Sequence, residues 1–214
     1  MGAAMNLGQF LKMAALAGLS PVGGSSGRSS WDGEPDVAPN LSDFAWTNQS
    51  GAVAEQRNGY FSMLTTDKPS TDTIRILTVP APGVPYTATA RMQGLLSVNY
   101  HGYGMCMMDT IAGQMMTHGT LGSTFHVAKW AAPTVFLQAE FNGSILHPRW
   151  LRVRDDGTNL YADMSSDGHL FANVWSGPRT YLPNGNPPNR VGIYLHSVGA
   201  QAQCSLHSWK VTTP

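Results

Sequence analysis

Arginine, aspartate and aromatic residues alternate with aliphatic ones between Trp150 and Trp175, and their chemistry suits the binding of a sugar. Aromatic rings stack on the faces of sugars, while arginine, aspartate and asparagine form directed hydrogen bonds. The alternative is an ordinary half-exposed sheet face with cross-strand pairs such as Arg152–Asp163, or a face covered by a loop or a neighbouring subunit. The candidate ligand-binding residues are Trp150, Arg152, Tyr161, Asp163, Phe171 and Trp175.

Glycoside cleavage needs two suitably placed carboxylates, and the chain offers few candidates. It has only three glutamates, Glu34, Glu55 and Glu140, and Glu34 lies in an N-terminal arm. Asp155 and Asp156 stand beside glycine in a turn sequence, where a structural role explains them. We therefore expect no catalytic residues and no enzyme, and a glycoside hydrolase is the least favoured alternative.

Metal and cofactor chemistry has little support in the sequence. The seven histidines form no close-spaced set of ligands, and no zinc pattern is present. Asp155, Asp156 and Asp163 are the acids that a Ca²⁺ ion could use, with nothing further to support such a site. There is no Gly-x-Ser-x-Gly sequence and no phosphate-binding glycine loop. We expect no metal and no cofactor.

The elements that carry the candidate residues are predicted to be β-strands. Between Trp150 and Trp175, two turn sequences that contain Asp-Gly, a strong hairpin signal, join three short runs. From Leu41 onward, short runs with turn signals between them predict an all-β sandwich or barrel. The other expected strands are Phe44–Trp46, Gly59–Thr65, Thr73–Val79, Tyr86–Met92, Leu95–Tyr100, Gly104–Asp109, Gln114–His118, Phe125–Lys129, Val135–Phe141, Val191–Ser197 and Gln203–Thr212.

Side chains alternate across a strand, so the three runs divide into two faces. The face predicted to join the core is aliphatic and contains Leu151, Val153, Leu160, Ala162, Met164, Leu170, Ala172 and Val174. The opposite face contains Trp150, Arg152, Arg154, Asn159, Tyr161, Asp163, Phe171, Asn173 and Trp175. The candidate ligand-binding residues therefore share one face of a predicted β-meander.

Residues 1–40 differ in composition from the rest of the chain and are predicted to form a short helix and an extended anchoring arm. Apolar residues recur at helical spacing from Met5 to Leu19, and Pro21 ends the pattern. A signal peptide is the alternative, with Lys12 before a short apolar run. The candidate anchor residues are Leu7, Phe10, Leu11 and Leu16, and the sandwich is expected to span residues 41–214.

Composition limits the partners of the chain. Its 214 residues suit one large sandwich, its formal net charge is zero, and only 12% of its residues are charged. There is no basic excess to attract nucleic acid or an anionic membrane, and no apolar run approaches the ~20 residues of a transmembrane helix. Such a surface suggests a protein built into an assembly, with a neutral monomer as the alternative.

The sulfur-containing residues indicate packing. Cys106 and Cys204 are too few for a disulfide framework and are expected to be free and buried. Five methionines crowd one predicted hairpin and indicate a core or a subunit contact. They are Met105, Met107, Met108, Met115 and Met116.

Three stretches resemble the concanavalin-A-like jelly rolls of lectins, glucanases and tailed-phage virion proteins. They are the run LRVRDDGTNLYADMSSDGHLF from Leu151, the closing stretch Leu206–Val211, and Gly102-Tyr103-Gly104 with Met105–Asp109. The resemblance covers about residues 41–212 and implies a two-sheet antiparallel jelly-roll sandwich. It does not fix an activity, because this fold hosts lectins, glycosidases and structural domains alike.

The arm, the low charge and the resemblance together favour a non-enzymatic virion component: a capsid decoration, head-fibre or tail protein. Residues 1–40 would anchor it to other virion proteins, and the lectin-like domain would project, most simply as a homo-oligomer such as a trimer. The expected location is the virion, assembled in the host cytoplasm. The alternative is a glycan-binding module that attaches to surface carbohydrate, and the two roles are compatible.

Overall fold

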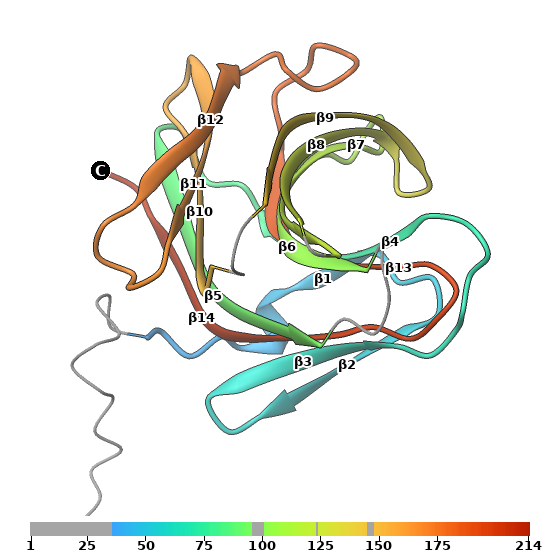
Figure 1. The fold of residues 1–214 in the computed structure, drawn as a ribbon. Helices are drawn as coiled ribbons and strands as arrows, with labels where there is room; N and C mark the ends of the chain where they lie inside the picture. The colour runs from blue at the N-terminus through green and yellow to red at the C-terminus, as the bar shows by residue number, and fades with distance from the viewer. Residues whose placement is uncertain (1–35, 96–100, 123, 145–147) are drawn as a thin grey trace, which may run out of the picture. The chain divides into compact units, whose positions relative to one another are not determined.

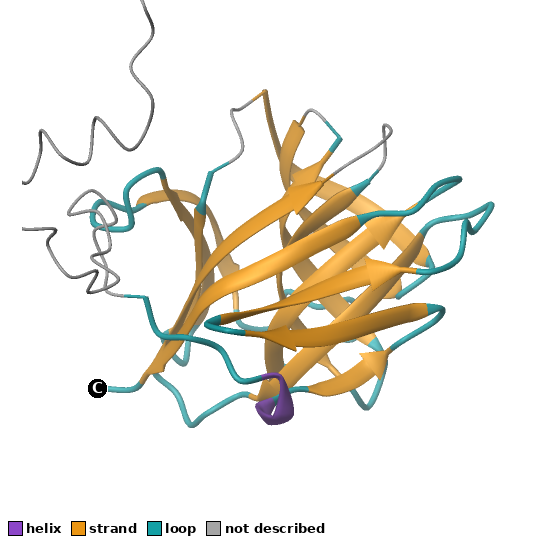
Figure 2. Ribbon diagram, turned by 90° about the horizontal axis from the view of Figure 1, so that it is seen from below, coloured by secondary structure: helices purple, strands orange, loops and turns teal. Residues whose placement is uncertain are grey.

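The computed structural model describes residues 36–95, 101–122, 124–144 and 148–214, and most of this part is β-strand (Figures 1 and 2). The predicted N-terminal helix, the anchor residues Leu7, Phe10, Leu11 and Leu16, and most of the predicted strand Leu95–Tyr100 lie outside it. One 3-10 helix, η1 (Leu41–Asp43), precedes the first strand, and Asn40 caps it by accepting a hydrogen bond from the Ser42 amide. Among these residues, no helix has the length and apolar character to cross a membrane.

The described strands form two seven-stranded antiparallel sheets that pack as a sandwich, which confirms the predicted fold class. Sheet 1 contains, in spatial order, β1 (Ala45–Asn48), β4 (Thr73–Pro80), β13 (Arg190–Ser197), β6 (Gly102–Asp109), β7 (Gln114–Leu121), β8 (Thr124–Ala132) and β9 (Val135–Ser144). Sheet 2 contains β12 (Ala172–Pro178), β11 (Asn159–Ser165), β10 (Trp150–Asp155), β5 (Tyr86–Leu95), β14 (Gln203–Thr212), β3 (Tyr60–Thr65) and β2 (Ala52–Arg57). The sequence pattern missed β2, an edge strand with mostly exposed side chains.

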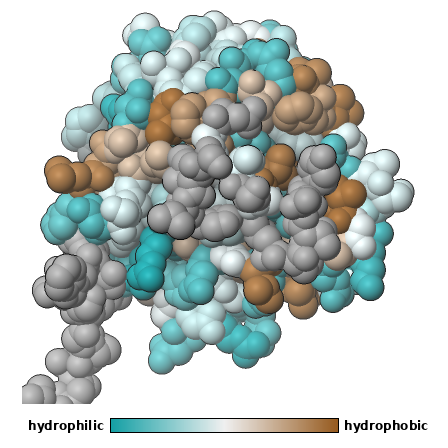
Figure 3. Space-filling view, in the orientation of Figure 1, coloured by the Kyte–Doolittle hydropathy of each residue, from teal (hydrophilic) through white to brown (hydrophobic). Residues whose placement is uncertain are grey.

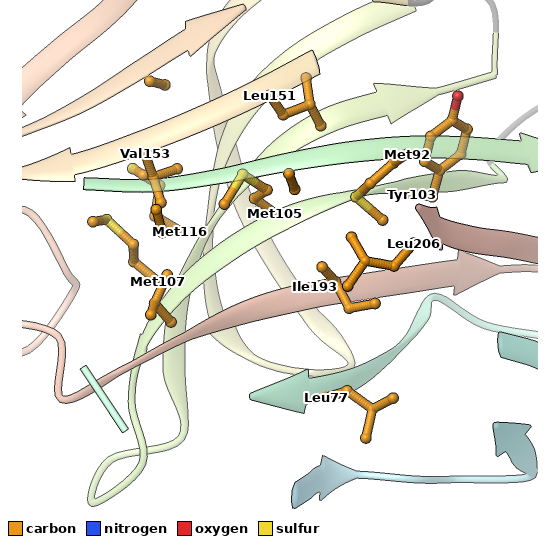
Figure 4. Packing of buried hydrophobic residues seen from close by; sticks show 14 of the residues in the cluster. Leu77, Met92, Tyr103, Met105, Met107, Met116, Leu151, Val153, Ile193 and Leu206 are labelled. Carbon is orange, nitrogen blue, oxygen red and sulfur yellow. The ribbon is translucent and has the colours of Figure 1, made fainter. Parts of the chain in front are cut away.

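The main core lies between the sheets and is built from the inward-facing residue of each alternating pair (Figure 4). Met105, Met107 and Met116 are fully buried there, so this part of the methionine cluster is core, which was one of the two predicted alternatives. The predicted aliphatic face of the meander also holds for Leu151, Val153 and Leu160. Cys106 and Cys204 are free and buried, as expected.

Sheet 1 has a second apolar cluster on its other face, and this cluster is also closed to water. It consists of Ile74, Ile76, Cys106, Met108, Met115, Ala128, Trp130 and Tyr194, and we call it the curled face. In Figure 1, β7, β8 and β9 curve strongly, and the Ile74 amide donates to the Pro133 carbonyl at 2.9 Å, which ties β4 to the β8–β9 turn. The curvature therefore lets one sheet bury side chains on both faces.

Close approach inside the curled face requires glycine. A Cβ on Gly119 would lie 2.2 Å from the Tyr103 carbonyl oxygen and 2.8 Å from the Tyr194 hydroxyl. The Tyr194 hydroxyl donates to the Thr120 carbonyl at 3.3 Å. The tyrosine ring thus occupies space that a side chain at position 119 would fill.

The chain just before η1 is attached to sheet 2. Asp36 accepts hydrogen bonds from Nη1 of Arg91 at 2.8 and 3.0 Å, and the Val37 amide donates to the Ser208 hydroxyl at 2.9 Å. The Trp209 amide donates to the Val37 carbonyl at 2.9 Å. The predicted boundary between residues 40 and 41 stays a prediction, although Asp36 and Val37 already bond to the sandwich.

Exposed large apolar side chains include three consecutive residues of β9, Val135, Phe136 and Leu137, and the cross-strand pair Val53 and Leu64. In the view of Figure 3, brown residues form separate patches among hydrophilic ones. Exposed apolar residues that stand alone, such as Ile111 and Leu170, are normal for protein surfaces.

Candidate functional site

Strands β10, β11 and β12 form the predicted meander at one end of sheet 2. Their outward-facing residues Arg152, Arg154, Tyr161, Asp163 and Asn173, with Phe171 from the preceding turn, form a surface that we call the meander face. Arg152 pairs with Asp163 across the strands, and Arg154 pairs with Tyr161. The regular register of β10 and β11 sets these pairs, because alternate residues of a strand point to the same side.

One carboxylate organises the meander face. Oδ2 of Asp163 accepts from Nε of Arg152 at 2.9 Å and from Nε of Arg154 at 2.7 Å. Oδ1 accepts from Nη2 of Arg154 at 3.1 Å and from Nδ2 of Asn173 at 2.9 Å. The predicted pair Arg152–Asp163 is thus confirmed and is part of a larger network.

The environment of Asp163 favours its charged form. Its side chain is only 1% exposed, and burial alone would raise the pKa of the carboxyl. The hydrogen bonds from Arg154, Asn173 and Arg152 outweigh burial, and the pKa lies below its ordinary value. The hydrogen bond to Asp163 is also the main reason that the pKa of Arg154 is raised. Both charges therefore persist across the usual pH range.

Two aromatic rings cover the guanidinium groups. Cζ of Arg152 lies 3.9 Å from the centre of the Phe171 ring, and Cζ of Arg154 lies 4.2 Å from the centre of the Tyr161 ring. The Tyr161 hydroxyl donates to Oδ2 of Asp156 at 2.7 Å, which fixes that ring against the β10–β11 turn. The meander face thus holds two half-buried rings and two oriented cations side by side.

The turn aspartates have structural roles, as predicted. Oδ1 of Asp155 accepts from the Gly157 amide at 2.9 Å, and its carboxylate also accepts from Nε of Arg179. Asp156 accepts from the Thr158 amide at 2.7 Å, and Asp167 accepts from the His169 amide at 2.9 Å. Side-chain bonds of this type to backbone amides define Asx turns.

Trp150 lies on the predicted face but is closed off. It is 2% exposed, and a Cβ on Gly168 would lie 2.7 Å from Cε2 of its indole, so the β11–β12 turn folds tightly over it. On the neighbouring strand β5, Cζ of Arg91 lies 6.0 Å from the centre of the Trp150 ring. Among the described residues, this indole packs under a turn and offers no ring face to a ligand.

Trp175 lies on the opposite face from the one predicted. The register between β11 and β12 shifts so that Ala162 pairs with Trp175 while Asp163 pairs with Asn173, which leaves Val174 as the extra residue of a bulge. Trp175 consequently packs toward the core, with its ring centre 4.6 Å from that of Tyr181. Strict alternation fails here because a bulge inserts one residue into the period of two.

Leu170 was also predicted on the core face, and that prediction is wrong. It is 81% exposed in the β11–β12 turn, because β12 begins only at Ala172.

Arg154 and Asn173 were absent from the predicted ligand set, yet both donate hydrogen bonds to Asp163 at the centre of the meander face. The signal for Arg154 was its spacing of two residues from Arg152, which puts both guanidinium groups over one face.

A buried histidine connects the meander to sheet 1. Nε2 of His118 on β7 lies 2.7 Å from the main-chain oxygen of Asp163, at the start of the bulge. Burial lowers the pKa of His118 to about 4, so the imidazole is neutral and donates this hydrogen bond. Its ring packs edge-on against Phe125 at 5.0 Å. The backbone position of Asp163 is therefore held from inside the sandwich.

A hollow of about 360 Å³ adjoins the meander face at Arg154. Thr87, Asp156 and Thr212 are among the other residues that line it. No group of three or more histidine, cysteine or acidic side chains that could hold a metal ion occurs in the described part of the chain. Asp163 and Asp155, two of the acids considered for Ca²⁺, are bonded to arginines instead.

Comparison with solved structures shows the fold of this chain, whereas no family model and no curated protein matches it. A protein of unknown function from Saccharomyces cerevisiae has a TM-score of 0.62 at 18% identity, over 82% of this chain and 99% of that one. The carbohydrate-binding module CBM66 from Bacillus subtilis has a TM-score of 0.52 at 11% identity, over 80% of this chain and 96% of the module.

An engineered GH43 glycoside hydrolase has a TM-score of 0.58 at 11% identity. The match covers 91% of this chain but only 43% of the hydrolase, so the chain corresponds to less than half of that enzyme. At such low identities these likenesses show a shared β-sandwich fold. The predicted phage relationship has no counterpart among these three structures.

Proposed function

We propose that this chain is a non-catalytic carbohydrate-binding module and that the meander face contacts the sugar. The observation that carries the proposal is the pairing of two half-buried rings, Phe171 and Tyr161, with two guanidinium groups fixed by Asp163. Rings supply the apolar contact for a sugar face, and guanidinium N–H groups donate to its oxygens. Ring contacts and hydrogen bonds already hold these groups in place, so binding would cost little further side-chain entropy.

The similar structures support this proposal without assigning a ligand. One is named as a carbohydrate-binding module, and another belongs to a glycoside hydrolase of which this sandwich matches a minor part. A β-sandwich of this kind, by itself, is consistent with a domain that binds carbohydrate while cleavage occurs elsewhere or not at all.

The contacts of four acids support the non-catalytic part of the proposal. Asp155 and Asp163 are bonded to arginines, Glu55 pairs with Arg57, and Glu140 accepts a hydrogen bond from Gln138. None of these contacts resembles a carboxylate pair held open around a glycosidic bond. Incubation with neutral and acidic polysaccharides should release no reducing ends, and sustained release would contradict the proposal.

A glycan array of the whole chain tests the binding. We expect specific hits, and we expect the double variant Phe171→Ala, Tyr161→Ala to lose most of the signal. The matched control is Phe136→Ala, because Phe136 is an exposed ring on β9 of the other sheet. An array without hits, or equal loss in the control, would overturn the proposal.

The virion role stays a prediction about residues 1–40, of which the structure describes only 36–40. It concerns an anchor and an assembly rather than the meander face, so it is compatible with carbohydrate binding. Sedimentation of the whole chain, with and without virus particles, would test both the anchor and the expected homo-oligomer.

A further inference from the structure

The two arginines of the meander face share a single carboxylate. Arg152 and Arg154 are two residues apart on β10, so their Cα atoms lie about 7 Å apart and their side chains leave the same side of the strand. Asp163 accepts four hydrogen bonds, two at each oxygen, which uses the acceptor capacity of a carboxylate. It therefore supplies one negative charge to two guanidinium groups, and Asp156 in the adjoining turn attracts Arg154.

Several guanidinium nitrogens remain available for a ligand. Nη1 and Nη2 of Arg152 and Nη1 of Arg154 have no hydrogen-bond partner within residues 36–95, 101–122, 124–144 and 148–214. The two side chains are 26% and 34% exposed, so solvent reaches them. Asp163 and the stacked rings already fix both planar groups, and a bound anion would therefore cost little further side-chain entropy.

One further cation lies in the same row of sheet 2, and one further acid acts on Arg154. Lys210 on β14 lies in the same row across sheet 2 as Arg152, because both pair with Thr89 of β5. Asp156 in the turn attracts Arg154 electrostatically, and the Tyr161 hydroxyl and two backbone amides donate to its carboxylate. The donors available to an anion on this face are therefore the N–H groups of Arg152 and Arg154 that lack a partner within the described residues.

The hollow beside Arg154 provides room for a sugar ring. Its volume of about 360 Å³ is within the range of small-molecule sites, and the hydroxyls of Thr87 and Thr212 suit sugar hydroxyls. A carboxylate matches the planar fork of arginine better than a neutral hydroxyl does, because it accepts two charge-assisted hydrogen bonds at once.

We infer that the sugar bound by the meander face is acidic: a uronic acid residue whose carboxylate accepts the unpartnered N–H groups of Arg152 and Arg154. This inference rests on the proposed function and adds the class of ligand. It makes Arg152 and Arg154 the residues that discriminate between acidic and neutral sugars.

Calorimetric titration of the whole chain with oligogalacturonides and with their methyl esters tests the inference without altering the protein. The two ligands differ in charge and share the sugar ring. The acidic form should bind at least about tenfold more tightly at low ionic strength. That advantage should shrink when salt is raised from about 0.05 M to about 0.5 M, because the arginines are partly exposed.

Variants then locate the site. Arg152→Gln should abolish the preference for the acidic form, and Arg152→Lys, which keeps the charge and the fold but loses the fork, should reduce it. The control is Arg57→Gln on β2, at the far end of the same sheet and paired with Glu55 in a solvent-exposed bridge. Arg57→Gln should leave the preference unchanged.

The outcomes separate the two proposals. Equal binding of both forms would overturn the acidic ligand and leave carbohydrate binding intact. Binding of neutral sugars alone would do the same. Failure to bind any sugar, here and on the array, would overturn both. A preference that survives Arg152→Gln and disappears in Arg57→Gln would place the anion site elsewhere and overturn this assignment.

Discussion

The meander face and the curled face of sheet 1 both bury polar groups, but the buried group stays charged in the first and becomes neutral in the second. Asp163 stays charged at 1% exposure because four donors from three side chains surround it. His126, beside the curled cluster on β8, has no such partner in the part of the chain that the structure describes, and burial lowers its pKa to about 4. A buried charge persists only where partners replace water, and otherwise the group becomes neutral.

The difference bears on the role proposed for each region, which is ligand binding for the meander face and stability for the curled face. The meander face keeps oriented charges beside half-exposed rings, which is an arrangement that a ligand can use. The curled face is apolar, and Nε1 of Trp130 donates to the Thr117 hydroxyl at 3.0 Å within it. Among the described residues of the two regions, only the meander face presents unpartnered guanidinium donors to solvent.

Acidification should lower the free energy of unfolding more than any of the substitutions below. The folded pKa of His118 and of His126 is about 4, below the ordinary value of 6.5, so the unfolded chain binds more protons between those values. Stability is therefore unaffected above pH 6.5 and falls as the pH drops toward 4, by about 3 kcal/mol for each histidine. Urea unfolding followed by tryptophan fluorescence at stepped pH measures this.

The variant His126→Gln should remove the part of that pH dependence that His126 contributes, and His169→Gln, in an exposed turn, should leave it unchanged. Below pH 3.8, protonation of Asp163 adds a further loss, because its folded pKa is depressed and its contribution disappears as the pH falls through it. A urea unfolding midpoint that is constant from pH 7 to pH 4.5 would contradict the prediction that these histidines are neutral in the folded state.

The close packing of the curled face should make it intolerant of added volume. Gly119→Ala would force a Cβ against the Tyr103 carbonyl and the Tyr194 hydroxyl, at a cost of about 3 kcal/mol. Gly83→Ala is the control, since nothing lies within 4 Å of its added Cβ. Thermal unfolding of both variants checks the prediction, and equal melting temperatures would show that the curled face is looser than described.

Removing the shared charge should damage the meander face. Asp163→Asn keeps the shape but leaves two neighbouring guanidinium groups without a counter-charge, at a cost of about 2 kcal/mol, moderated by their partial exposure. Glu55→Gln breaks only an exposed pair and should change stability by less than about 0.5 kcal/mol. Urea unfolding distinguishes them, and similar values for both variants would argue against a buried ionic network.

A neutral hydrogen bond inside the curled face should contribute less. Thr117→Val removes the acceptor of the Trp130 indole and should cost about 1 kcal/mol. The control is Ser205→Ala, whose hydroxyl lies 2.8 Å from that of Ser62 in a partly buried position that water can reach. If Thr117→Val cost as much as Asp163→Asn, the contrast between charged and neutral networks would not hold.

Local sequence patterns predicted the sandwich and most of the meander. Alternation placed Leu151 and Val153 in the core and Arg152 opposite Asp163, because the register of β10 and β11 is regular. It failed at Trp175, since a bulge depends on contacts that are distant in sequence, such as the bond from His118 to the Asp163 main chain. The sequence did not predict the curled face either, because the burial of this cluster depends on the curvature of a whole sheet.

The ligand-binding role of the meander face is tested most directly by NMR of arginine side chains. The Nε–H signals of Arg152 and Arg154 report on their guanidinium groups, and Arg57 in the same sheet serves as an internal reference. On addition of oligogalacturonide, the signals of Arg152 and Arg154 should shift and saturate together, while that of Arg57 stays in place. Saturable binding with shifts confined to other residues, or no shift at any concentration, would contradict the assignment of the meander face as the carbohydrate-binding site.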